Sequence, residues 1–109
     1  MEVGGDKPAT KLPPLDVIFE SCIGCKWSVR VLGLVRAGVN RPGAMERAVE
    51  GLTAKVLAER LAKLTHFGIF EKRSFAEVPP RVEYHLTPFG VRFAAILDEI
   101  EGLRREFSG

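Results

Sequence analysis

Long hydrophobic runs are missing from this sequence of 109 residues. No apolar run reaches the roughly 18 residues that a membrane-spanning helix requires, and residues 1–11 are too polar for the apolar core of a secretory signal. We therefore expect a cytoplasmic protein. A chain of this length makes one compact domain with a modest core, which we place at residues 14–107, after a flexible N-terminal arm at residues 1–13.

Histidine and cysteine are scarce as well. The two histidines, His66 and His85, lie far apart, and the two cysteines form a single C-x-x-C at Cys22 and Cys25. A structural zinc site needs four ligands brought together, but no second C-x-x-C exists and the two histidines are distant single residues. The sequence also lacks a Ser/His/Asp arrangement, a glycine-rich loop that would cradle a phosphate, and paired carboxylates in a predicted cleft. We therefore expect no enzyme, no metal site and no cofactor.

The C-x-x-C leaves two interpretations open. Cys25 lies near the start of a predicted helix and beside Lys26, and both features favour a thiolate. Oxidation of Cys22 and Cys25, or modification of Cys25, would then tilt the first helix and so report redox conditions. In the other interpretation both cysteines stay reduced and pack as small hydrophobic residues. A thioredoxin-like site is not expected, because the motif has no βαβ context.

A large excess of one charge is also absent, since the net charge is +2. The distribution is uneven, however. Residues 26–63 contain eight lysines and arginines but three glutamates, a local charge of +5, which leaves −3 for the rest of the chain. A basic middle segment is typical of a surface that faces a polyanion, although a helix made basic for solubility gives the same pattern.

Apolar residues at helical spacing predict three helices in the first half of the chain. Residues 15–20 form a short apolar segment, and residues 25–36 form an amphipathic helix. Gly38 stands where the second helix would end in a left-handed residue. Pro42 can open a third helix, which Gly51 would stop.

The clearest helix begins at Thr53, whose side chain can cap its N-terminus, and ends near Phe67. Its apolar face consists of Leu57, Leu61 and Leu64, with Ala54 near the same stripe. Its outward residues are Lys55, Val56, Glu59, Ala62 and Lys63, with Arg60 on the border. A short helix, a tight glycine-containing turn and a longer helix with a charged outer face are the parts of a helix–turn–helix.

After Gly68 the hydrophobic period changes from 3.6 to 2. Residues 69–75 are β-prone, and residues 81–86 alternate between apolar and polar side chains. Pro79 and Pro80 cannot donate to a β-ladder, so they belong at a hairpin tip or a strand edge. A hairpin directly after the long helix is the wing of a winged helix–turn–helix.

A last helix opens at Thr87 and Pro88, which suit the N-cap and first helical positions. Its apolar residues recur at intervals of three and four: Phe93, Ile96, Leu97, Ile100, Leu103 and Phe107. That stripe is long for the terminal helix of so small a domain. It can pack on the domain's own core, but we favour a partner helix from a second chain.

Three segments resemble one known family. Residues 78–90 read VPPRVEYHLTPFG, similar to the signature V-P-P-R-V-E-Y-x-L-T-x-x-G of HxlR-type winged helix–turn–helix transcription regulators of bacteria and archaea. Residues 24–27 (GCKW) are similar to the family's G-G-K-W, and residues 52–61 (LTAKVLAERL) to its I-S-x-K-x-L-T-x-R-L. The resemblance covers about residues 15–107.

The resemblance implies a mainly α fold with a small β-hairpin wing, flanked by N- and C-terminal dimerisation helices. It further implies a homodimer that regulates transcription from the double-stranded DNA it binds. The expected dimerisation residues are Leu15, Ile18, Phe19, Phe93, Ile96, Leu97, Ile100, Leu103 and Phe107. Three departures matter: Pro14 stands where the family often has a cysteine, Cys25 replaces the second glycine of G-G-K-W, and residues 41–45 (RPGAM) replace the family's R-F-x-E-L.

A helix in the major groove of DNA meets the bases with its N-terminal residues. The expected reading residues are therefore Thr53, Ala54, Lys55 and Val56, with Glu59 one turn later. Lys55 can donate to guanine or contact a phosphate, and both possibilities stay open. Arg60 and Lys63 are expected to contact the DNA backbone, although Arg60 can instead form an intramolecular ion pair.

Four further basic residues are candidates for DNA contact outside that helix. Arg41 precedes the first helix of the motif, and Lys72 and Arg73 lie on the wing strand. Arg81 lies at the wing tip, where it can enter a minor groove or pair with Glu77 or Glu83. Two copies would place their reading helices about 34 Å apart, so the operator should be an inverted repeat. The alternative is a winged helix that contacts other proteins without binding DNA.

Overall fold

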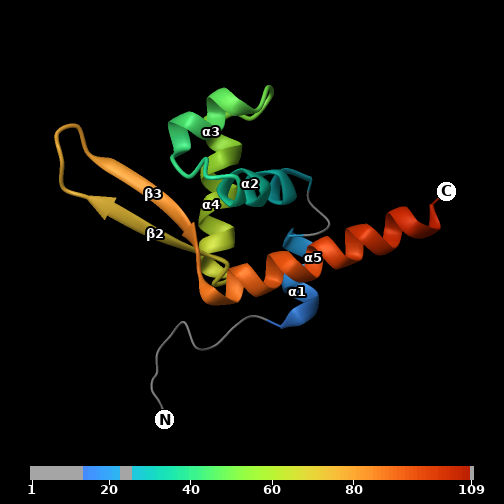
Figure 1. The fold of residues 1–109 in the computed structure, drawn as a ribbon. Helices are drawn as coiled ribbons and strands as arrows, with labels where there is room; N and C mark the ends of the chain where they lie inside the picture. The colour runs from blue at the N-terminus through green and yellow to red at the C-terminus, as the bar shows by residue number, and fades with distance from the viewer. Residues whose placement is uncertain (1–13, 23–25, 109) are drawn as a thin grey trace, which may run out of the picture.

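The computed structural model describes residues 14–22 and 26–108. In chain order its elements are α1 (Leu15–Cys22), α2 (Lys26–Arg36), α3 (Pro42–Ala48), α4 (Ala54–His66), β2 (Phe70–Phe75), β3 (Arg81–Leu86) and α5 (Pro88–Phe107) (Figure 1). The two strands form one antiparallel hairpin. This order confirms the predicted mainly α fold with a small β-hairpin. Within the described ranges, no helix is long and apolar enough to cross a membrane.

The hydrophobic core collects side chains from all five helices and from β2. Its buried members are Ile18, Val31, Leu32, Val35, Met45, Leu52, Leu57, Leu61, Leu64, Phe67, Ile69, Phe70, Phe93 and Ala94. The α4 leucines at 57, 61 and 64 lie on one helical face, as their spacing predicts. Ala54, expected near that stripe, is instead exposed in the first turn of α4, and Val56 is half-buried against the core.

The predicted N-caps fix both long helices at their starts. Thr53 Oγ1 accepts a hydrogen bond from the Val56 amide at 3.2 Å, and Thr87 Oγ1 accepts one from the Gly90 amide at 2.9 Å. Thr87 also donates its hydroxyl to the Gly68 carbonyl at 2.5 Å. This side chain therefore caps α5 and anchors it to the turn between α4 and β2.

The turn between α3 and α4 depends on Gly51, which has a φ of 89°. Residues with a side chain rarely adopt this left-handed conformation. The Trp27 ring packs beside the turn, since a Cβ on Gly51 would lie 3.8 Å from the ring atom Cη2. The α2 helix thereby supports the geometry that links the two helices of the motif.

The hairpin is buried at its base and exposed at its tip. Its register pairs Phe70 with Leu86 at the base and Phe75 with Arg81 near the tip. The Tyr84 amide donates to the Asn40 carbonyl at 2.8 Å, which ties β3 to the loop between α2 and α3. All six β3 residues are half-buried, so the expected alternation does not produce one covered and one open face.

The second half of α5 extends away from the body of the molecule (Figure 1). Its first half packs through Phe93 and Ala94, and a two-pronged ion pair from Arg36 to Asp98, at 2.8 and 2.6 Å, joins it to α2. The radius of gyration is 15.1 Å, against about 13 Å for a compact domain of this length. The difference reflects the projecting hairpin and the projecting end of α5.

Candidate nucleic-acid interface

The start of α4 lies at one end of the molecule together with α3 and the hairpin tip, opposite α1 and the first turn of α5 (Figure 1). Along α4 the outward residues Thr53, Ala54, Lys55, Glu59 and Lys63 are all exposed. A helix with an accessible polar face and a supporting helix behind it has the form that enters a major groove.

Two of the predicted α4 residues are less accessible. Val56 is half-buried because it packs against the core, so only part of its side chain reaches the surface. Arg60 is half-buried too, and it already interacts within the protomer. A contact of Arg60 with the DNA backbone therefore stays a prediction, with an intramolecular ion pair as its alternative.

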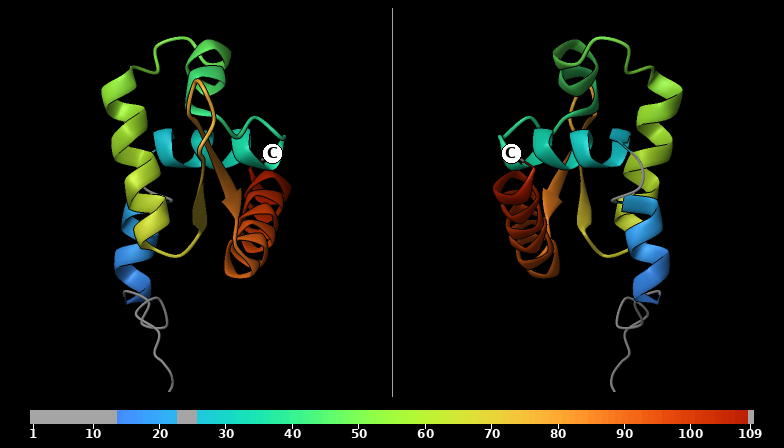
Figure 2. Two further views of the ribbon diagram at one scale, coloured as in Figure 1. Left: turned by 90° about the vertical axis from the view of Figure 1, so that its left-hand side faces the viewer. Right: turned by 90° about the vertical axis from the view of Figure 1, so that its right-hand side faces the viewer.

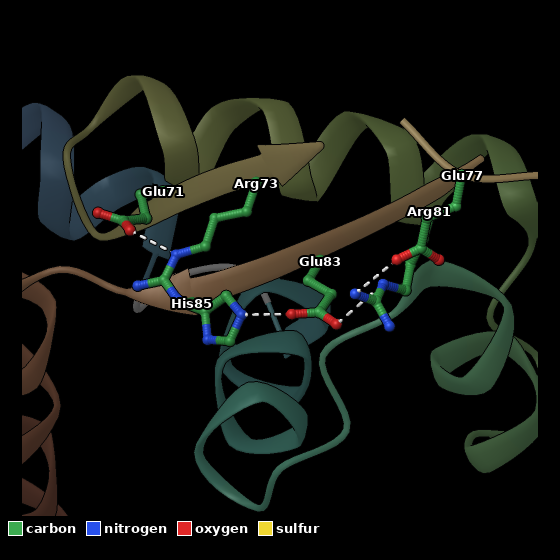
Figure 3. A network of polar contacts seen from close by, with 6 residues as sticks. All are labelled: Glu71, Arg73, Glu77, Arg81, Glu83 and His85. Carbon is green, nitrogen blue, oxygen red and sulfur yellow. Dashed lines mark hydrogen bonds and ion pairs between the residues drawn. The ribbon is translucent and has the colours of Figure 1, made fainter. Parts of the chain in front are cut away.

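Arg81 is held in a network of charged side chains on the hairpin (Figure 3). Its Nη2 lies 3.1 Å from Glu77 Oε2, and its guanidinium lies 4.2 Å from the centre of the Phe75 ring. Its Nε is buried 3.4 Å from Glu83 Oε2, close enough for an ion pair but without a hydrogen bond. The pairing that the sequence left as an alternative to DNA contact is thus formed in this structure.

Glu83 continues the network towards the hairpin base. The His85 Nε2 lies 2.8 Å from Glu83 Oε1, and this hydrogen bond holds the pKa of the Glu83 carboxyl below its ordinary value. The charges of Arg81, His85 and Arg41 act in the same direction, against the opposing effect of burial. Glu83 is therefore a carboxylate at neutral pH and keeps Arg81 oriented.

The remaining basic candidates differ in their surroundings. Lys72 is exposed on β2, whereas the neighbouring Arg73 donates from Nε to Glu71 at 2.7 Å (Figure 3). Arg41 is exposed at the N-cap of α3. Arg47 was not predicted, but it is also exposed on α3, four residues after Gly43. Its place in the basic segment of residues 26–63 was the signal available in the sequence.

A family model described as HxlR-like helix-turn-helix matches residues 22–108. The chain belongs to the HxlR-like helix-turn-helix family. Among relatives of this HxlR-like chain, the HTH-type transcriptional regulator YtfH of Escherichia coli (strain K12) is 36% identical over 101 residues, which cover 89% of this chain and 79% of YtfH. The predicted family is confirmed by both comparisons.

Solved structures support the same conclusion. A transcriptional regulator of the MarR family from Enterococcus faecalis V583 matches with a TM-score of 0.76 and 29% identity, covering 98% of this chain and 93% of that one. The reduced form of the transcriptional regulator YodB from B. subtilis matches with a TM-score of 0.76 and 25% identity, covering 90% and 95%. The HxlR-like chain is thus a winged helix–turn–helix transcriptional regulator rather than an enzyme.

The residues expected to dimerise in this HxlR-like chain fall into two groups. Ile18 and Phe93 belong to the protomer's own core, and Leu97 packs against it. On α5 the side chains that are exposed are Ile96 (53%), Ile100 (41%), Leu103 (58%) and Phe107 (79%). The side chains of Leu15 and Phe19 lie outside the described residues. The accessible part of the predicted stripe therefore consists of Ile96, Ile100, Leu103 and Phe107.

The predicted redox pair is Cys22 and Cys25. Cys22 is the last residue of α1, but its side chain and the whole of Cys25 lie outside the described residues. Within the described part of the chain, no group of three or more His, Cys, Asp or Glu side chains is arranged to hold a metal ion.

Proposed function

We propose that this HxlR-like chain is a sequence-specific regulator that binds double-stranded DNA as a homodimer, in the cytosol, on an inverted-repeat operator. The observation that carries the proposal is the exposed first turn of α4, where Thr53, Ala54 and Lys55 are accessible. The start of α4, α3 and the hairpin tip lie at the same end of the molecule (Figure 2). Residues in this position meet base edges when a helix lies in the major groove.

The α4 side chains divide into two kinds of contact. Lys55 donates to guanine O6 or N7, and Glu59, one turn later on the exposed face, accepts from cytosine N4. Lys63 contacts phosphate and contributes affinity without sequence information. The half-buried Val56 offers a small apolar surface to a thymine methyl group, and Arg60 plays a smaller part because it is engaged within the protomer.

Side chains of the wing contact the phosphate backbone of the DNA beside the neighbouring groove. Lys72 is exposed and contacts phosphate directly, while Arg73 must first leave Glu71. Arg41 contacts phosphate from the start of α3. Arg81 acts mainly through the shape of the hairpin, because Glu77 and Glu83 already hold its guanidinium.

Lys55→Ala is expected to lower operator affinity about tenfold and to weaken discrimination against random DNA, since a specific base contact contributes about 1–3 kcal/mol. Lys63→Ala, on the same exposed face, is the matched control. It should weaken binding to all DNA alike and lower the slope of log affinity against log salt concentration by about one. DNA selected from a random pool provides the operator, and fluorescence anisotropy provides the affinities.

Two outcomes would contradict these assignments. An equal loss for Lys55→Ala on operator and random DNA would make Lys55 a phosphate contact. If the wild-type protein bound no DNA in a salt-sensitive and sequence-dependent way, a gel-shift assay would show this directly. The HxlR-like fold would then serve as a protein–protein interaction module instead.

The homodimer is proposed to form through the exposed apolar residues of α5. A twofold pairing of these helices would bring two α4 helices to one side, about 34 Å apart, which is one turn of DNA. Each copy then reads one half-site, and the operator is symmetric. The projecting end of α5 supports this proposal, because a four-residue apolar stripe on a single chain lies open to water.

Redox regulation through Cys22 and Cys25 is a further proposal for this chain. It is supported by the C-x-x-C motif and by the similarity to YodB, which has been solved in reduced and in diamide-treated forms. Cys25→Ser is expected to abolish any change of operator affinity on diamide treatment while leaving the reduced affinity within about twofold. An unchanged diamide response in this variant, measured by anisotropy, would reject the switch.

A further inference from the structure

A basic hollow of about 440 Å³ lies between α3 and the start of β3. Its walls carry three arginines, Arg41, Arg47 and Arg81, and no acidic residue. The segment of α3 that lines it, residues 42–44, is Pro-Gly-Ala, so small side chains leave the space open. Two segments far apart in the sequence thus meet around a positively charged recess.

The guanidinium of Arg47 is directed back over the first turn of α3. A Cβ built on Gly43 would lie 3.5 Å from Arg47 Nη1, which places that nitrogen above the glycine. Among the residues that the structure describes, no ion pair joins Arg41 or Arg47 to a carboxylate. Both side chains are exposed, so a ligand can reach them.

Arg81 closes the hollow on the hairpin side and is fixed in place. Glu77 and Glu83 pair with it (Figure 3) but do not line the recess, and the charge of Arg41 contributes to the lowered pKa of Glu83. Guanidinium groups present planar pairs of donors that match the oxygen atoms of phosphate. Arg41 at the N-cap of α3 and Arg47 within it offer such donors, and Arg81, already paired with Glu77 and Glu83, closes the recess, so the site suits a tetrahedral oxyanion.

The geometry points to a phosphate-binding site in this hollow, with the exposed Arg41 and Arg47 as its two ligands and Arg81 as its wall on the hairpin side. This inference rests on the proposed function, because it assigns the site to a phosphate of the DNA backbone next to the groove that α4 occupies. A free phosphorylated compound offers the same chemistry, so the experiment must distinguish the two sources.

Arg47→Ala is expected to weaken binding about threefold to tenfold on operator and random DNA alike, and to lower the slope of log affinity against log salt by about one. Gly43→Leu keeps every charge but fills the hollow, and it should cause a similar loss. Arg92→Ala, an exposed arginine on α5, removes the same charge away from α3 and should stay within about twofold of the wild type. Melting temperatures from circular dichroism verify that all variants fold.

Two results would overturn the site. If Arg47→Ala behaves like Arg92→Ala, Arg47 holds no phosphate. If Arg47→Ala weakens binding but Gly43→Leu does not, the arginine acts through a diffuse field rather than through a recess.

A titration with inorganic pyrophosphate, followed by NMR, identifies the source of the phosphate. Saturable shifts at millimolar pyrophosphate, absent in Arg47→Ala and competitive with DNA, would support a site for a free phosphorylated compound. No shifts, together with the expected DNA effects, would support the DNA backbone. If the wild-type protein binds no DNA, the proposed function fails, and the pyrophosphate titration then tests the hollow by itself. Saturable shifts would show that the hollow binds anions, and the absence of shifts would show that it does not.

Discussion

Gly90→Ala is expected to lower the free energy of unfolding by about 3 kcal/mol, even though alanine is the better helix former. Gly90 lies buried in the first turn of α5. A Cβ at this position would collide with the carbonyl oxygen of Ile69, and it would also lie 3.0 Å from the Ile69 carbonyl carbon and 3.2 Å from Leu86 Cδ2. The colliding atom is backbone, so it cannot rotate away as a flexible side chain can.

The surroundings give this collision little room to relax. Ile69 is fully buried, and its carbonyl accepts a hydrogen bond from the Thr87 amide at 3.0 Å. Thr87 also binds the neighbouring Gly68 carbonyl through its hydroxyl. Moving α5 outward to make room for the methyl group would therefore break the contacts that hold this helix to the turn before β2. The substitution consequently lowers the free energy of unfolding.

Gly33→Ala is the matched control for this substitution. Gly33 lies within α2, and a Cβ there would meet nothing within 4 Å, so alanine should raise stability by about 0.5–1 kcal/mol. Urea denaturation at one fixed protein concentration measures both variants, because dimerisation would shift the apparent stability. Equal midpoints for the two variants would show that α5 is not packed on Ile69 as described.

The helices of the motif could be predicted because their signals are local. The Thr53 cap and the spacing of Leu57, Leu61 and Leu64 mark α4 without any tertiary information, and the structure places its start and buried face accordingly. Half-buried positions were less predictable. Val56 borders the apolar face, so its burial depends on how α4 is turned against the other elements, which periodicity alone does not fix.

The candidate site was harder to predict where partners come from distant segments. Whether Arg81 faces DNA or carboxylates depends on the distances to Glu77 and Glu83 across a formed hairpin. Arg47 was missed for the same reason. Its recess exists because β3 is tied to the loop before α3, through the Tyr84 amide and the Asn40 carbonyl, and no sequence spacing encodes that contact.

The apolar stripe of α5 shows a related ambiguity. Phe93 and Leu103 follow the same spacing of three and four, yet Phe93 is 6% exposed in the core and Leu103 is 58% exposed. Periodicity identifies an apolar face, but it does not say which neighbour covers each part of it. The tertiary structure divides the stripe, and the exposed half is the part that a second copy can cover.

Leu103→Asp is expected to weaken dimerisation about 100-fold or more and to lower operator affinity by a similar factor. In a twofold interface the substitution occurs twice, and each buried, unpaired carboxylate costs about 3–5 kcal/mol. Glu99 and Glu106 line the same surface as Leu103, so the new charge also adds repulsion. A 100-fold loss corresponds to about 2.7 kcal/mol for the dimer, less than these two penalties together, so it is the lower limit of the expected effect. Because Leu103 is exposed in the protomer, the domain itself should stay folded.

Val91→Asp separates loss of the stripe from a general effect of charge on α5. Val91 is 55% exposed, close to the value for Leu103, but it lies about 120° away around the helix. For Val91→Asp, sedimentation should show the same dimer as the wild type, and fluorescence anisotropy should show the same operator affinity. If the Leu103→Asp protein stays dimeric, the interface lies elsewhere. If it is monomeric yet binds the operator as tightly as the wild type, a single α4 is sufficient for recognition.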